Sequence, residues 1–157
     1  MKRTKHNQLK ILAIDPASKL GWAISSKLYG EWDLITRKDE SMGMKLIRLR
    51  SKLQEIYNNH PFDLIVYERP AGMHKNPIIH QSKLIGTIET WCEENIPAIE
   101  YRGYSATEIK KFATGKGNAG KPAMIQAAIK NYGYIGDSDN EADALHLLHL
   151  AKKEYKI

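Results

Sequence analysis

The sequence predicts an α/β domain in which helices cover both faces of a mixed five-stranded sheet. The chain has 157 residues, which is the length of one domain and enough to bury a hydrophobic core. Short apolar runs, typical of strands, alternate with longer segments in which apolar residues recur every three or four positions, as in helices. The resulting order is β-β-β-α-β-α-β-α-α, and a helical crossover makes the fourth strand parallel to the first. We interpret residues 1–157 as a single domain.

Three strands open the predicted fold. Residues 9–14 are apolar and end at Asp15, which is typical of a buried strand followed by a turn. Residues 20–25 and 29–36 alternate between apolar and polar positions around a turn at 27–30, which predicts a hairpin.

The same periodicities predict the remaining elements. Two further strands are expected at residues 63–67 and 97–101. Helices are expected from Met42 to about residue 58, over 78–92, from the capping box of Ser105 and Glu108 to Ala113, from Pro122 onward, and from about Ser138 to Lys153. The histidines of the last helix, His146 and His149, are expected on its surface or rim.

The stretch ATGKGNAGKPAM, residues 113–124, comes close to the phosphate-binding loop of nucleotide hydrolases. Gly115, Gly120 and Lys121 fit that pattern, but Pro122 stands where a Ser or Thr hydroxyl should hold magnesium. A helix, not a buried strand, precedes the loop. We therefore expect no nucleotide cofactor and interpret the segment as a glycine loop between two helices. It carries Lys121 either toward other phosphates or as part of a solvated connector.

Charge and cysteine content narrow the classes of function. Lys and Arg number 24 against 18 Asp and Glu, a formal charge of +6, which favours a polyanionic partner. Residues 102–130 hold six basic residues and one acidic residue, a net charge of +5. The lone Cys92 excludes a disulfide framework and indicates a reducing environment. Because it falls among apolar helical positions, we expect it to be a core residue. No apolar run is long enough for a membrane span or a signal peptide, so we expect a cytoplasmic protein.

Carboxylates follow the first and fourth predicted strands. Asp15 ends one strand and Glu68 ends the other, and the carboxyl ends of parallel neighbours lie at the same edge of a sheet. On the last helix, Asp143 lies four residues after Asp139 and three after Asn140, so these three residues share one face, while Glu141 points away from it. Such a set of oxygen ligands suits Mg²⁺ and not zinc. Two ions about 4 Å apart would activate a water and stabilise the leaving oxygen of a phosphodiester.

Four segments in sequence then resemble those of RuvC-type Holliday junction resolvases: ILAIDPASKLGWAI, DLIVYERP, YSATEIKKFATGKGNAGKPAM and NEADALHL. The resemblance implies a ribonuclease H-like fold and a Mg²⁺-dependent endonuclease, with Mn²⁺ as the other candidate ion and two ions per site. It also implies a homodimer that nicks branched DNA symmetrically, namely four-way junctions, forks and flaps. The short form resembles phage-encoded relatives, and a phage-encoded protein would act in the cytoplasm of the host cell.

By that resemblance Asp15, Glu68 and Asp143 are the metal-binding carboxylates, and Lys110 and Lys121 are the two functional lysines near the scissile phosphate. The family has a carboxylate or a histidine where this chain has Asn140. An amide oxygen binds magnesium more weakly than a carboxylate, and Asp139 is the alternative fourth ligand.

Further basic residues are candidate phosphate contacts, and residues 1–8 are expected to form a basic, disordered arm. These candidates are Arg69, Lys75, Lys83, Arg102, Lys111 and Lys116. Met73 is the nearest apolar candidate for a wedge in the junction, where bacterial relatives insert an aromatic residue. Two alternatives stay open: a non-catalytic protein that binds branched DNA, and another ribonuclease H-like nuclease that acts on flaps or RNA-DNA hybrids.

Overall fold

The computed structural model describes residues 9–70 and 76–157 and contains a five-stranded mixed sheet. The strands are β1 (Ile11–Asp15), β2 (Lys19–Ser25), β3 (Leu28–Asp33), β4 (Leu64–Glu68) and β5 (Glu100–Tyr104). The helices are α1 (Met42–Asn59), α2 (Asn76–Glu94), α3 (Ala106–Thr114), α4 (Lys121–Tyr132) and α5 (Asp139–Glu154). The predicted element order is confirmed. The predicted arm at residues 1–8 lies outside the described residues, as do Met73 and Lys75.

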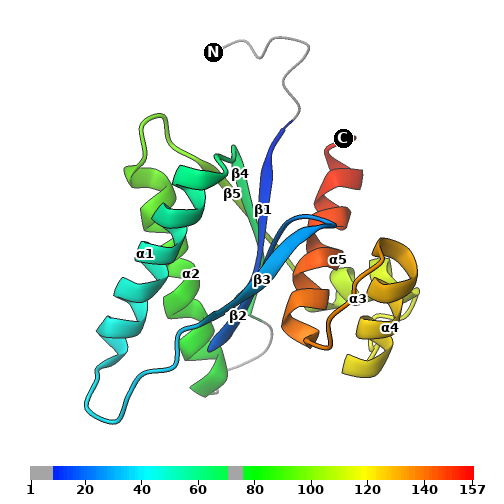
Figure 1. The fold of residues 1–157 in the computed structure, drawn as a ribbon, viewed down its shortest axis with the longest axis horizontal. Helices are drawn as coiled ribbons and strands as arrows, with labels where there is room; N and C mark the ends of the chain where they lie inside the picture. The colour runs from blue at the N-terminus through cyan, green and yellow to red at the C-terminus, as the bar shows by residue number, and fades with distance from the viewer. Residues whose placement is uncertain (1–8, 71–75) are drawn as a thin grey trace.

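The strand order across the sheet is β3-β2-β1-β4-β5. β1 pairs antiparallel with β2 and parallel with β4, and β5 continues the sheet parallel to β4. The crossover that contains α1 therefore places the ends of β1 and β4 side by side, as the sequence predicts (Figure 1).

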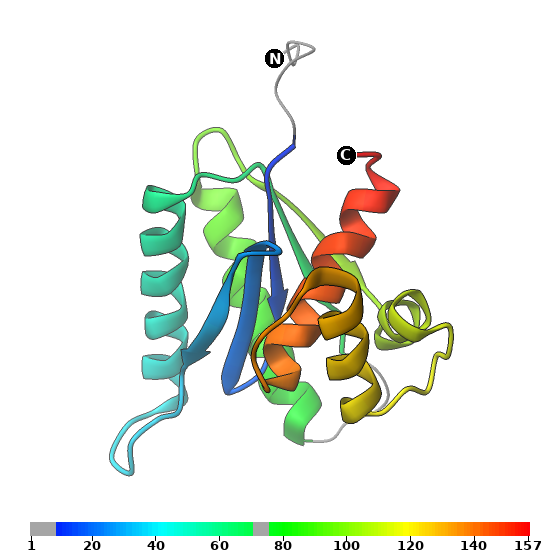
Figure 2. The ribbon, with the colours of Figure 1, turned by 45° about the vertical axis from the view of Figure 1, so that its right-hand side comes forward.

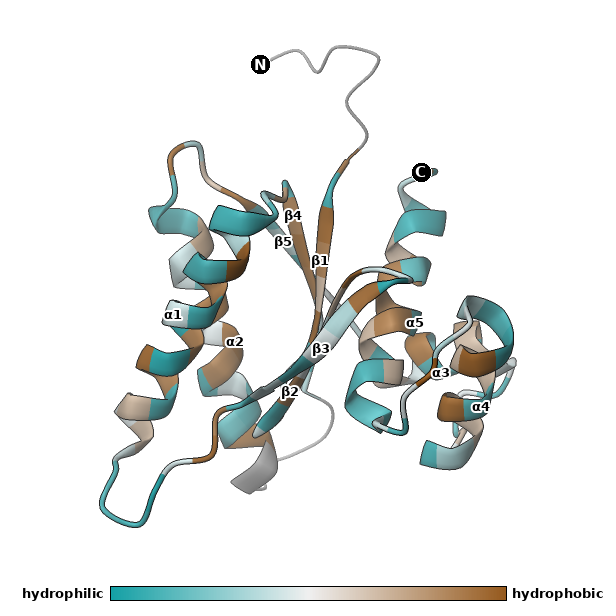
Figure 3. Cartoon of the chain, viewed as in Figure 1, coloured by the Kyte–Doolittle hydropathy of each residue, from teal (hydrophilic) through white to brown (hydrophobic). Residues whose placement is uncertain are grey.

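Helices cover both faces of this sheet. Figures 1 and 2 show α1 and α2 on one face and α3, α4 and α5 on the other. β1 supplies both cores because successive side chains of a strand point to opposite faces. Leu12 and Ile14 pack in the core under α1 and α2, while Ile11 and Ala13 pack in the core under α5. Figure 3 shows hydrophobic residues along β1 and β4 and in the middle of α2 and α5, which lie on opposite faces of the sheet.

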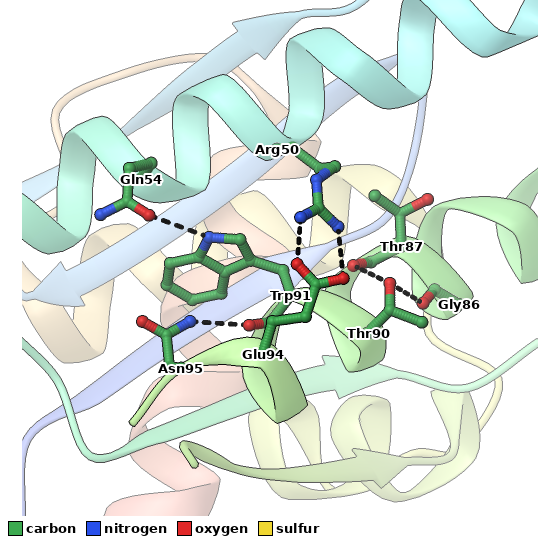
Figure 4. Close-up of polar contacts among 8 residues, drawn as sticks. All are labelled: Arg50, Gln54, Gly86, Thr87, Thr90, Trp91, Glu94 and Asn95. Atoms are coloured by element: carbon green, nitrogen blue, oxygen red, sulfur yellow. Dashed lines mark hydrogen bonds and ion pairs between the residues drawn. The ribbon is translucent and has the colours of Figure 1, made fainter. Parts of the chain in front are cut away.

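Side-chain hydrogen bonds and an ion pair join α1 to α2 (Figure 4). The indole of Trp91 donates to Gln54 Oε1 at 3.3 Å, and Arg50 pairs with Glu94. Cys92, next to Trp91, is fully buried, and burial raises the pKa of its thiol to about 12. The expectation that Cys92 is a core residue is confirmed. None of the helices in the described ranges is both long and apolar enough to cross a bilayer.

Three local predictions are wrong. The β2–β3 turn is at residues 26–27, and β3 ends at Asp33. β5 begins at Glu100, three residues later than expected, because its pairs with β4 run from Glu100 with Leu64 to Tyr104 with Glu68. Pro97 lies before the strand and lacks the N–H that a strand ladder needs.

The expectation that His146 lies on the surface is also wrong. Its side chain is fully buried between α5 and α4. One ring nitrogen lies 2.8 Å from the carbonyl oxygen of Met124 and the other lies 3.1 Å from the hydroxyl of Tyr132. Two polar partners on α4 therefore satisfy both ring nitrogens of this buried histidine.

Candidate active site

Asp15 and Glu68 lie next to each other at one edge of the sheet. β1 and β4 are in parallel register, with Ile14 opposite Tyr67, so the following residue of each strand is a carboxylate. Asp15 is 8% exposed, and Glu68 is half-buried. Both side chains were predicted at this edge, and the topology brings them together there.

The third predicted carboxylate comes from α5, which lies directly on the sheet. Gly21 of β2 pairs with Asp15, and a Cβ at Gly21 would stand 2.0 Å from the backbone oxygen of Asn140. Only glycine permits this close approach of helix and strand. One turn further along α5, Asp143 is half-buried and its Oδ1 has no hydrogen-bond partner in the described part of the chain.

The carboxylates act on one another electrostatically. The pKa of Asp15 is raised well above its usual value, first by burial and then by the charges of Asp143, Glu68 and Asp139. Burial, with the charges of Glu68 and Asp139, raises the pKa of Asp143 to about 7. Burial also raises the pKa of Glu68, while a hydrogen bond from Gln81 and the charge of Lys110 lower it by less. The site therefore concentrates negative charge that a bound cation would stabilise.

The donor chemistry of this cluster fits a hard divalent cation. Asp15, Glu68 and Asp143 offer carboxylate oxygens, and among residues 9–70 and 76–157 the buried Oδ1 of Asp143 has no hydrogen-bond partner. Within residues 9–70 and 76–157, no three His, Cys, Asp or Glu side chains already stand in the geometry of a metal site. The structure thus brings Asp15, Glu68 and Asp143 near enough for the negative charges among them to raise the pKa values of Asp15 and Asp143.

Both predicted lysines face this acidic centre. The charge of Lys110, on α3, lowers the pKa of Glu68 and Asp143, opposing the dominant effect of burial. Lys121, the first residue of α4, places its Nζ 3.6 Å from Asp139 Oδ2, and its side chain is 80% exposed. The loop between the two helices begins at Gly115, whose φ of 84° is in the left-handed region that favours glycine.

Asp139 and Asn140 have different partners at the start of α5. Asp139 faces Lys121, whereas the Asn140 amide donates from Nδ2 to Glu31 Oε2 at 3.1 Å. Glu141 points away, as predicted, and accepts a hydrogen bond from the Tyr134 hydroxyl at 2.7 Å. Glu31, on β3, is a member of this neighbourhood that the sequence did not indicate.

The predicted phosphate contacts divide by position. Lys111 and Lys116 are exposed on α3 and in the loop after it, and Lys83 is exposed on α2. Arg102 turns toward the far end of α5, where its Nη2 lies 2.6 Å from Glu154 Oε1. It lines a hollow of about 350 Å³ between β5, α3 and α5. The structure does not bring Arg102 to the carboxylates.

Arg69 directly follows Glu68, and its side chain crosses β5 at Gly103, where a Cβ would stand 2.3 Å from Arg69 Cγ. Its backbone N–H donates to the Tyr104 carbonyl at 2.7 Å. Tyr104 is 3% exposed, which agrees with packing in the core. Arg69 therefore leaves the sheet at the edge that carries the acidic residues.

A mixed sheet of this strand order, with carboxylates at the ends of β1 and β4 and on the helix that crosses them, defines a ribonuclease H-like protein. No protein-family model matches the chain. Two curated relatives, the crossover junction endodeoxyribonucleases RuvC of Ehrlichia ruminantium strains Gardel and Welgevonden, are each 30% identical over 158 residues, covering 87% of this chain and 94% of the relative. The chain belongs to the RuvC family of crossover junction endodeoxyribonucleases.

Solved structures agree on the fold. RuvC of Thermus thermophilus in complex with a Holliday junction substrate superposes with a TM-score of 0.74 at 17% identity, covering 95% of each chain. A second Thermus thermophilus RuvC structure gives a TM-score of 0.72 at 16% identity, covering 94% of this chain and 97% of the other. The yeast mitochondrial Holliday junction resolvase Ydc2 gives 0.55 at 14% identity, covering 94% and 83%.

Proposed function

We propose that this chain is a Mg²⁺-dependent, structure-selective DNA endonuclease that resolves Holliday junctions and other branched DNA. The observation that carries the proposal is the convergence of Asp15, Glu68 and Asp143 at one edge of the sheet, beside Lys110 and Lys121. Membership of the RuvC family supports the same activity, since the similar relatives are named for it.

Asp15, Glu68 and Asp143 would hold the metal, with a fourth oxygen from Asn140 or Asp139. Two Mg²⁺ ions, or Mn²⁺ in their place, supply Lewis acidity and an activated water for phosphodiester hydrolysis. The protein contributes the placement of these oxygens. The raised pKa values of Asp15 and Asp143 follow first from burial and then from the neighbouring carboxylates, and a divalent cation would relieve that repulsion.

Lys121 and Lys110 contribute positive charge for the scissile phosphate. Lys121 is mostly exposed and pairs with Asp139 at 3.6 Å, a contact that a phosphate oxygen can replace. Lys110 adds a second positive charge from α3, close enough to act on Glu68 and Asp143. Negative charge grows on the phosphate oxygens during hydrolysis, and fixed cations beside them lower the barrier.

The remaining contacts with DNA follow the exposed cations. Lys111 and Lys116, exposed on α3 and in the loop after it, and Lys83, exposed on α2, would add phosphate contacts. Arg69 leaves the same edge of the sheet, whereas Arg102 would meet DNA only on the β5 flank. Symmetric nicking of two strands requires two such sites, so we infer a two-fold homodimer.

The test is cleavage of a labelled four-way junction by the wild-type protein and by Asp15→Asn and Glu68→Gln. We expect each substitution to lower the single-turnover rate by at least ~100-fold, the scale of loss when a group that stabilises transition-state charge is removed. Glu55→Gln, which removes an exposed carboxylate on α1, is the matched control. Undiminished cutting by the two site variants would remove these carboxylates from the mechanism.

The same assay separates the alternatives. Tight, metal-independent binding of the junction without nicks identifies a non-catalytic protein that binds branched DNA. Faster cutting of flaps or RNA-DNA hybrids than of four-way junctions identifies a different ribonuclease H-like nuclease.

A further inference from the structure

Glu31 lies in the same row of the sheet as Asp15. The antiparallel registers pair Asp15 with Gly21 and Gly21 with Glu31, so the three residues cross β1, β2 and β3 in line. Directly paired residues project from the same face. The first turn of α5 rests on Gly21 and therefore has Asp15 on one side and Glu31 on the other.

Glu31 holds that turn at two points. Its Oε2 accepts hydrogen bonds from the Ser138 hydroxyl at 2.8 Å and from the Asn140 amide at 3.1 Å. Ser138 is the N-cap of α5, and its hydroxyl also accepts from the backbone N–H of Glu141 at 3.2 Å. Glu31 thus links the edge strand β3 to the helix that carries Asp143.

The hydrogen bond between Glu31 and Asn140 determines which atom of the Asn140 amide stays available to bind a cation. An ionised carboxylate can only accept hydrogen bonds, so Glu31 bonds to the NH₂ group of Asn140. The amide oxygen Oδ1 then points in a different direction from the NH₂ group. A cation requires that oxygen, because an amide nitrogen cannot bind it. Asp139, the competing candidate, instead faces Lys121 at 3.6 Å.

We propose that Glu31 is a positioning residue of the cation site, which orients Asn140 so that Oδ1 becomes the fourth oxygen ligand. The inference rests on the proposed function, because it concerns the metal of that same site. Outer partners that orient a ligand typically change metal affinity by about 10- to 100-fold.

The experiment is calorimetric titration of the DNA-free protein with Mn²⁺. We expect Glu31→Ala to bind Mn²⁺ about 10-fold or more weakly than the wild type. Glu100→Ala is the matched control, since it removes an exposed carboxylate from the opposite end of the parallel strands. Wild-type affinity in Glu31→Ala would overturn the inference.

A double-mutant cycle asks whether Glu31 acts through Asn140. In an Asn140→Ala background, Glu31→Ala should cause little further loss of Mn²⁺ affinity. If the two losses simply add, Glu31 does not act by orienting Asn140 and the inference fails.

If Glu31→Ala does not fold, a double variant that exchanges the carboxylate and the amide between positions 31 and 140 still tests the inference. The pair Glu31→Gln with Asn140→Asp keeps the total charge and one hydrogen bond while placing the carboxylate on α5. Affinity near the wild-type value supports the proposal, and a loss of about 10-fold or more contradicts it. If the wild type itself neither binds Mn²⁺ nor cuts junctions, the proposed function fails; if it does both while Glu31→Ala matches it, only the inference fails.

Discussion

Gly21 lies directly beneath the backbone of Asn140, so close that a side chain on Gly21 would overlap the Asn140 carbonyl oxygen, 2.0 Å from its Cβ. This contact fixes how near the first turn of α5 comes to β2. Asp143 sits one turn further along the helix, where its charge raises the pKa of Asp15, although burial of Asp15 contributes more. The distance between helix and sheet therefore sets the distance between two carboxylates of the site.

Replacing Gly21 with alanine should push α5 away from the sheet. Overpacking of this kind costs about 1–3 kcal/mol and often shifts the backbone. We expect Gly21→Ala to lower the free energy of unfolding by that amount in urea titrations and to weaken Mn²⁺ binding at the same time. Gly43→Ala, whose Cβ would meet Ser41 Oγ at 3.6 Å, is the control and should lower neither the free energy of unfolding nor the affinity for Mn²⁺. A Gly21→Ala protein with wild-type stability would contradict the closeness of this contact.

The raised pKa of Asp143 makes the metal-free protein less stable at high pH. Its folded pKa of about 7 exceeds the ordinary value of 3.8, so the folded state holds the proton more tightly than the unfolded chain. Stability should fall as pH rises from about 4 to 7, by roughly 3–4 kcal/mol at most. Bound Mg²⁺ should reverse the loss at pH 8.

The measurement is urea unfolding of the wild type and Asp143→Asn from pH 4 to pH 8 in EDTA. Asp143→Asn should be the more stable protein at pH 8 and should lose that advantage toward pH 4. Burial lowers the pKa of His146 and His149, which works in the opposite direction below pH 6.5. Both histidines are present in each protein, so the difference between the two curves isolates Asp143. A difference that is constant with pH would count against the raised pKa.

Removing the cation of Lys121 should slow chemistry more than binding. We expect Lys121→Ala to lower the single-turnover cleavage rate of a junction by about 10- to 100-fold. The dissociation constant of Lys121→Ala for the junction should rise far less, since Lys121 is one of several cations on this surface. Lys130→Ala, an exposed lysine in the last turn of the same helix, is the control. Equal cleavage rates for Lys121→Ala and the wild type would exclude the role given to Lys121.

The strand topology could be predicted from the sequence because the patterns that determine it, apolar strands and an amphipathic helix, lie within short segments. Apolar runs before Asp15 and Glu68, with one amphipathic helix between them, require parallel strands whose ends meet. β5 was misplaced because EYRGY, residues 100–104, alternates between exposed and partly buried positions and lacks an apolar run. Only its pairing with β4 fixes its start.

The site was predictable to the extent that its residues follow strand ends or share a helix face. Asp139, Asn140 and Asp143 could be grouped by spacing alone. Glu31 could not, because its place depends on two antiparallel registers and on the close approach of α5 over Gly21. Burial of His146 was missed for a similar reason, since its partners Met124 and Tyr132 belong to another helix.

The burial of Cys92 makes site-specific fluorescent labelling of this protein straightforward. It is the only cysteine of the chain, it is fully inside the protein, and burial raises its thiol pKa to about 12, so thiolate is scarce at neutral pH. Maleimide dyes should leave it untouched in the folded state. A cysteine introduced at an exposed position such as Lys116 could then carry a fluorophore without first removing the native sulfur.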